Sequence, residues 1–91
     1  MSWTWDVDKA SANRVKHGVS FELARLVFAD QLHLSQLDPH LDGDRWRTLG
    51  HVGPVCLFVV HSWPEADEDE GRIISARRAT AHERRSYEEG I

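Results

Sequence analysis

Residues 71–89 read GRIISARRATAHERRSYEE and predict a strand that leads directly into a helix. The first part, Arg72–Arg78, contains β-branched isoleucines and suits a strand whose side chains alternate between two faces. Thr80 and Glu83 then have the spacing of a capping box, in which each side chain accepts a hydrogen bond from the other residue's backbone amide. We therefore expect a helix over Thr80–Glu89.

The same segment concentrates positive charge in an acidic protein. The chain carries a net charge of −4, which argues against a protein that binds nucleic acid over its whole surface. The run 65–70 supplies five of the fifteen acidic residues, so the remainder of the chain is about neutral. Five arginines gather in the quoted segment: Arg72, Arg77, Arg78, Arg84 and Arg85. Because so many arginines gather in one segment of a protein whose net charge is negative, the segment indicates an anion-binding site.

Outward from this segment, the sequence predicts further strands and two more helices. They are a strand Ser2–Trp5, a helix Lys9–His17, a helix from the Ser20 cap to about Ala29, and strands Leu32–Asp38, Arg45–Val52 and Val55–His61. Residues 39–44 have the composition of a turn, and the acidic run 65–70 that of a hairpin loop. This order predicts an α+β domain, with a small antiparallel sheet of four to five strands, two helices in the N-terminal half and one C-terminal helix. Ninety-one residues are enough for a single domain, 1–91.

Composition narrows the class of protein further. The single cysteine, Cys56, excludes an internal disulfide and suits a reducing compartment. The N-terminal residues lack an apolar leader, and no apolar stretch approaches the length of a membrane span, so we expect a cytoplasmic protein with no membrane partner. Six histidines are scattered without the spacing of metal ligands, so we expect neither a metal nor a cofactor.

Three blocks of the sequence resemble a known family. WDVDKASANRVKHGVSFELARLVFAD at 5–30, RWRTLG at 45–50 and RIISARRATAHERRSYEE at 72–89 are similar to the BrnT toxins of type II toxin–antitoxin systems. The resemblance implies a RelE-like fold and a small ribonuclease that cleaves messenger RNA and inhibits translation. It also implies a BrnA-like antitoxin that neutralises the toxin in a heteromeric complex. Because that antitoxin is the DNA-binding partner, contact with DNA is expected only through it.

Cleavage of RNA without a metal requires groups that move protons at the 2′-hydroxyl and the leaving 5′-oxygen, and cations that stabilise the phosphorane. Histidine suits proton transfer near neutral pH, and arginine pairs two phosphate oxygens while keeping its charge. We expect catalytic roles for Arg77, His17, Lys16 and Arg45. Lys16 and His17 end a helix, so they are equally suited to capping its terminal carbonyls. The resemblance places Arg45 in a family block, on the same strand face as Arg47.

A second set of residues is expected to bind RNA: Arg72, Arg78 and Tyr87. Strand alternation puts Arg77 on a face with Ser75 and Ile73, opposite Arg72 and Arg78. Either Arg77 alone or the other two arginines together therefore face the RNA cleft, whose second wall we expect at Lys16–His17. Tyr87 shares a helix face with Glu83 and has two candidate roles, stacking on a base or packing the helix onto the sheet.

The chain departs from the family at three points near the expected cleft. Gly53–Pro54 stands where the family commonly has Gly-Arg, and His61 and Trp63 stand where it commonly has a threonine and an arginine. Two phosphate ligands are thereby missing. The alternative function is a catalytically weakened binding module that acts mainly through its antitoxin and the co-regulation of its operon.

Overall fold

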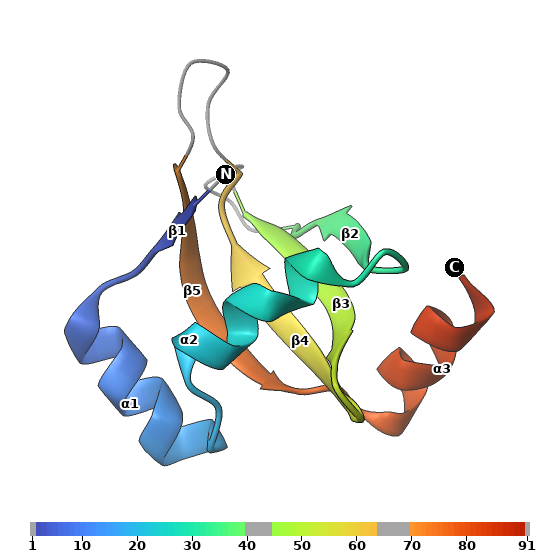
Figure 1. Ribbon diagram of the computed structural model, residues 1–91, viewed down its shortest axis with the longest axis horizontal. Helices are drawn as coiled ribbons and strands as arrows, with labels where there is room; N and C mark the ends of the chain where they lie inside the picture. The colour runs from blue at the N-terminus through green and yellow to red at the C-terminus, as the bar shows by residue number, and fades with distance from the viewer. Residues whose placement is uncertain (1, 40–44, 64–69, 91) are drawn as a thin grey trace.

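The computed structural model describes residues 2–39, 45–63 and 70–90. The helices and strands, in chain order, are β1 (Ser2–Thr4), α1 (Val7–His17), α2 (Phe21–Ala24), the 3₁₀ helix η1 (Arg25–Ala29), β2 (Leu34–Leu37), β3 (Trp46–Val52), β4 (Val55–His61), β5 (Glu70–Arg78) and α3 (Ala81–Glu89). Figure 1 shows α1 beside β5 and α3 on the other side of the molecule, beyond β3. The predicted α+β class is confirmed. The turn expected at 39–44 and the acidic loop fall largely outside the described residues.

The strands form one sheet in the order β1-β5-β4-β3-β2. Strands β2 to β5 pair antiparallel in sequence order, as expected. β1 instead pairs parallel with β5, with Ser2 opposite Glu70, so the sheet is mixed rather than purely antiparallel. Sequence alternation carries no information on this point, because a strand's direction relative to its neighbour is set by the connection between them.

A β-bulge in β5 changes which side chains share a face. Val60 pairs with Ser75 while the next residue, His61, pairs with Ile73, so one extra residue lies in β5 between them. As a result Ile73 and Ala76 both face the core, with 1% and 0% of their surface exposed. The expectation that Arg77 shares a face with Ile73 is therefore wrong.

The bulge also separates Arg72 from Arg78. Arg78 pairs with Leu57, whose side chain points into the core, whereas Arg72 directly precedes the core-facing Ile73 and so points to the other face. Of the two alternatives, the one in which Arg72 and Arg78 act together on one face is excluded by this register.

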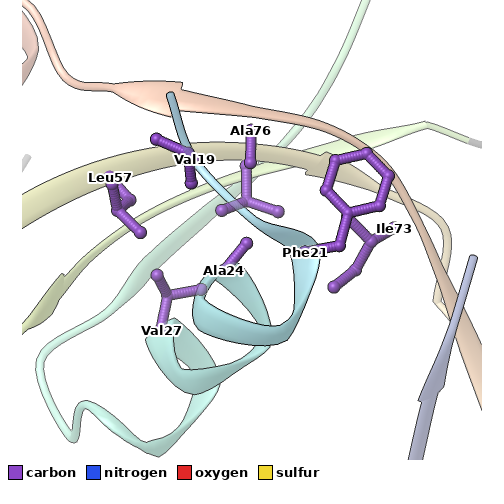
Figure 2. Packing of buried hydrophobic residues seen from close by; sticks show 8 residues of the cluster. Val19, Phe21, Ala24, Val27, Leu57, Ile73 and Ala76 are labelled. Atoms are coloured by element: carbon purple, nitrogen blue, oxygen red, sulfur yellow. The ribbon is translucent and has the colours of Figure 1, made fainter. Parts of the chain in front are cut away.

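The core lies between the sheet and the α2–η1 segment. Phe21, Ala24 and Val27 point from this segment toward Leu57, Ile73 and Ala76 of the sheet, as Figure 2 shows. The Ser20 hydroxyl accepts from the Leu23 amide and so caps α2 as predicted. The segment comes so close to β3 that a Cβ on Gly50 would lie 3.1 Å from Val27 Cβ. The segment predicted as one helix is α-helical as far as Ala24 and continues as a 3₁₀ helix from Arg25 onward.

Helix α1 is joined to the edge of β5 by one buried side chain. Asp6 caps the start of α1, and Gly18 ends it in the left-handed conformation at φ 72°. Asn13, 7% exposed, donates from Nδ2 to the carbonyls of Val19 and Ala76 and accepts from the Ala76 amide. It thereby satisfies backbone groups of β5 beyond the end of β1.

At the other end of the sheet, His61 is enclosed in a polar and aromatic cluster. Its Nε2 lies 2.6 Å from the Thr48 hydroxyl, which lies 2.7 Å from the Ser35 hydroxyl. The rings of Trp3, Phe28 and Trp63 surround the imidazole edge-on. Burial lowers the pKa of His61 to about 4, so the ring is neutral at ordinary pH.

This buried histidine predicts a loss of stability in weak acid. The unfolded chain takes up the proton near pH 6.5 but the folded one only near 4, so the unfolded state binds more protons between these values. We expect the free energy of unfolding to fall by about 2 kcal/mol from pH 6.5 to about pH 5. Urea unfolding at both pH values measures it, with His61→Gln as the comparison. An equal loss in the variant would contradict the assignment to His61.

Within the described ranges, no helix combines the length and apolar character needed to cross a bilayer.

Candidate functional site

A pocket of about 240 Å³ lies between α3 and the face of the sheet turned away from α2. Three adjacent strands supply its floor and the first turns of α3 supply one wall. The residues that line it are Leu34, Gln36, Arg47, Leu49, Phe58, His82, Glu83 and Ser86. Its floor is apolar and its rim polar, the composition typical of ligand sites.

Arg77 borders this pocket through a bidentate ion pair with Glu83. Arg77 Nη1 and Nη2 donate to the two carboxylate oxygens of Glu83 at 2.7 and 2.9 Å. Glu83 Oε1 also accepts from the Thr80 amide, and the Glu83 amide donates to the Thr80 hydroxyl, which completes the predicted capping box. Hydrogen bonding to Arg77 lowers the pKa of Glu83, and the same contact raises the pKa of Arg77. The pair is therefore fully charged at neutral pH.

The contacts of Arg77 leave one edge of its guanidinium available. Nη1 also donates to the Arg78 carbonyl at 3.1 Å, and the guanidinium carbon lies 4.2 Å from the centre of the Phe58 ring. Of the five N–H groups of an arginine, contacts among the described residues thus use two on Nη1 and one on Nη2. The Nε hydrogen and the second Nη2 hydrogen remain, side by side on one edge. This is the fork that pairs two oxygens of a phosphate.

Two further ionisable side chains reach the pocket that were not in the expected site. They are Arg47 on β3 and His82, which is exposed in the first turn of α3. The strand alternation that placed Arg47 on a face was visible in the sequence. The sequence does not show that this face meets α3, because that contact depends on where the helix packs on the sheet.

Lys16, His17 and Arg45 do not line this pocket. Lys16 is exposed and His17 half-buried in the last turn of α1, the helix that packs against β5. Contacts among the described residues do not bring either of them together with Arg77. Arg45 is half-buried just before β3, and its carbonyl accepts from the Asp38 amide. A wall of this pocket is therefore formed by α3, and Lys16 and His17 lie elsewhere on the molecule.

The residues expected to bind RNA lie outside the pocket. Arg72 is exposed on β5, and Arg78 is exposed at its end, where it lines a smaller hollow with Arg84 and Cys56. Tyr87 packs α3 onto β3: its ring lies 4.9 Å from that of His51, and its hydroxyl donates to Asp30. The hydrogen bond to the Asp30 carboxylate raises the pKa of Tyr87 to about 12.

Asp30 completes this contact between α3 and the sheet. Its carboxylate also accepts from the amides of His51 and Leu32, which explains its lowered pKa despite some burial. Because Tyr87 and Glu83 are both held, α3 is fixed against the sheet at two points one helical turn apart.

Comparisons with known proteins bear on the family of this chain. The model of the family described as the ribonuclease toxin BrnT of type II toxin–antitoxin systems matches residues 5–83. The crystal structure of the ribonuclease toxin BrnT from Brucella abortus is similar to this chain, with a TM-score of 0.65 and 31% sequence identity over 88% of this chain and 97% of that one. Among curated proteins there is no match.

Proposed function

Since this chain belongs to the BrnT family of ribonuclease toxins of type II toxin–antitoxin systems, we propose that it cleaves messenger RNA at the pocket beneath α3 and so inhibits translation. The observation that supports this location for the reaction is the free edge of the Arg77 guanidinium, formed by the Nε hydrogen and the second Nη2 hydrogen. A charged fork, already fixed by Glu83 and Phe58, borders a pocket that also holds a second arginine and a histidine. A scissile phosphate bound there would meet one cation, Arg77, that needs no rearrangement.

The proposed reaction uses the 2′-hydroxyl of the RNA as nucleophile and no metal ion. Arg77 and Arg47 neutralise the charge that develops on the phosphorane, solvent water accepts the proton released by the 2′-hydroxyl, and His82 donates a proton to the leaving 5′-oxygen. The O–P bond to the 2′-oxygen forms as the bond to the 5′-oxygen breaks, which leaves a 2′,3′-cyclic phosphate and a free 5′-hydroxyl. The proton-transfer role expected of His17 passes to His82 in this proposal, because His82 lines the pocket.

The proposal includes an antitoxin partner. A cognate BrnA-like antitoxin neutralises the toxin in the cytoplasm, and DNA is contacted only through that antitoxin. Arg72 and Arg78, both exposed at the surface, contribute to binding the RNA backbone outside the pocket. Tyr87, held by Asp30 and His51, serves to position α3.

One observation supports the catalytically weakened alternative. His61 and Trp63, which stand where the family commonly has a threonine and an arginine, lie in an aromatic cluster around a neutral imidazole. The end of β4 therefore offers no cation to a phosphate.

Growth after induced expression separates the two functions. An active ribonuclease arrests growth, and co-expression of the antitoxin encoded next to it restores growth. Harmless expression of a protein that still binds that antitoxin would support the binding module and overturn the enzyme.

The geometry predicts that Glu83 acts by holding Arg77. Glu83→Ala and Thr80→Ala each remove half of the capping box, at a cost of about 1 kcal/mol, but only Glu83→Ala also frees the guanidinium. We expect Glu83→Ala to lower kcat for RNA cleavage about tenfold or more, since an unfixed arginine must be ordered during the reaction. Thr80→Ala should keep kcat within about twofold. Single-turnover cleavage measures both, and equal losses would show that only helix stability matters.

A further inference from the structure

We propose that the pocket beneath α3 is a subsite for an adenine base of RNA and that Gln36 reads that base. The inference rests on the proposed function and extends it from the phosphate to the neighbouring nucleotide. Nothing in the sequence singled out Gln36, because its role depends on residues that are brought together only by the sheet.

The floor of the pocket is a single row of side chains that crosses the sheet. Leu34 pairs with Leu49, Leu49 with Phe58, and Phe58 with Arg77, so the row runs across β2, β3, β4 and β5. The first three side chains of the row are apolar, and the fourth, Arg77, is the cation proposed to bind the phosphate. A flat, apolar surface that ends in a cation matches a nucleotide, whose base is apolar on its faces and whose phosphate is charged.

The row places the Arg77 guanidinium beside the apolar floor of the pocket. The guanidinium of Arg77 reaches back over the Phe58 ring, 4.2 Å from its centre. It therefore lies over a side chain of β4, the strand next to β3, which supplies Leu49 to the pocket. A phosphate on the free edge of Arg77 would leave its base over Leu34 and Leu49, under the wall formed by His82 and Ser86.

Gln36 lies where it can contact the edge of that base. It is two residues beyond Leu34 on β2, on the same face, and pairs across the sheet with Arg47. The side chain is exposed on the rim and has no hydrogen bond with any other described residue. Its amide offers one donor and one acceptor, the pattern that complements N7 and N6 of adenine. A base over Leu34 and Leu49 would meet this amide, so Gln36 makes adenine the preferred base.

Titration of the purified protein with the four nucleoside 3′-monophosphates tests this subsite without requiring catalysis. We expect the adenosine nucleotide to bind with a Kd about tenfold lower than the uridine nucleotide, with NMR shifts at Gln36 and Ser86. Gln36→Leu should abolish this difference. The matched control Gln31→Leu, an exposed glutamine just before β2, should preserve it. Equal binding of all four nucleotides, a preference for guanosine, or an unchanged preference in Gln36→Leu would overturn the proposal.

Cleavage of oligonucleotides that differ only at the base beside the cut separates this inference from the proposed function. Cleavage without preference for adenine, unaltered by Gln36→Leu, refutes the base subsite and leaves the ribonuclease intact. Adenine-selective binding that depends on Gln36, in a protein that does not cleave RNA, supports the subsite and refutes the enzyme.

Discussion

Replacement of Arg77 by alanine is expected to lower the rate of RNA cleavage by about 100-fold or more, because removal of one preorganised donor to a developing charge typically costs that much. The fixed position of the guanidinium is the reason for so large an effect. Glu83 and the Arg78 carbonyl hold it from one side, and Phe58 supports its face, so its free edge is aligned before substrate arrives. Arg77→Lys should rescue little of the activity, since an ammonium lacks the planar fork.

The matched control for Arg77 is Arg25→Ala. Arg25 is an exposed arginine at the start of η1, so its loss changes the net charge equally. We expect this variant to cleave RNA within about twofold of the wild type. Initial rates on one RNA substrate compare the three proteins, and circular dichroism verifies that Arg77→Ala remains folded with Glu83 unpaired. Equal activity of the Arg77 and Arg25 variants would contradict the proposed role.

Replacement of Asn13 by alanine is expected to produce the largest change in stability, a loss of about 3 kcal/mol in the free energy of unfolding. The variant leaves the Ala76 amide and the carbonyls of Ala76 and Val19 without their partner in a buried place. The total free energy of unfolding of a domain of this size is roughly 5–10 kcal/mol, so the expected loss is a large fraction of it. Urea unfolding monitored by tryptophan fluorescence measures it.

Two companion variants make the Asn13 prediction specific. Asn13→Asp keeps the shape but turns a carboxylate oxygen toward two carbonyls, so it should destabilise at least as much as Asn13→Ala. Ser11→Ala, an exposed change in the same helix, should alter the free energy of unfolding by less than about 0.5 kcal/mol. A small effect of Asn13→Ala would show that α1 is not held to β5 through this side chain.

Much of the fold could be predicted from local sequence signals. The capping box at Thr80 and Glu83, the cap at Ser20 and the glycine that ends α1 are each read from a few neighbouring residues. The apolar strand Val55–His61 was predicted with its observed bounds. The bulge in β5 could not be predicted from the sequence, because it depends on how β5 pairs with β4. One extra residue there moved Arg77 to the face opposite Ile73.

The candidate site could be predicted only in part, for a related reason. The arginine cluster pointed to Arg77, and the capping box to Glu83, but the pairing of the two depends on how α3 turns back over the sheet. Arg47 and Gln36 are far from β5 in sequence and come near Arg77 only through cross-strand pairing. Asn13 is a polar residue of the predicted helix Lys9–His17, yet it is buried, because its side chain bonds to the backbone of Ala76 in β5.

We propose cleavage of RNA through the 2′-hydroxyl, with side chains alone supplying the catalytic groups, as the reaction of this chain. Its most direct test is to incubate the purified wild-type protein with RNA in excess EDTA and to analyse the ends of the fragments. We expect cleavage that persists in EDTA and yields 2′,3′-cyclic phosphate and 5′-hydroxyl ends. Intact RNA at high protein concentration, or fragments with 5′-phosphate ends, would contradict it.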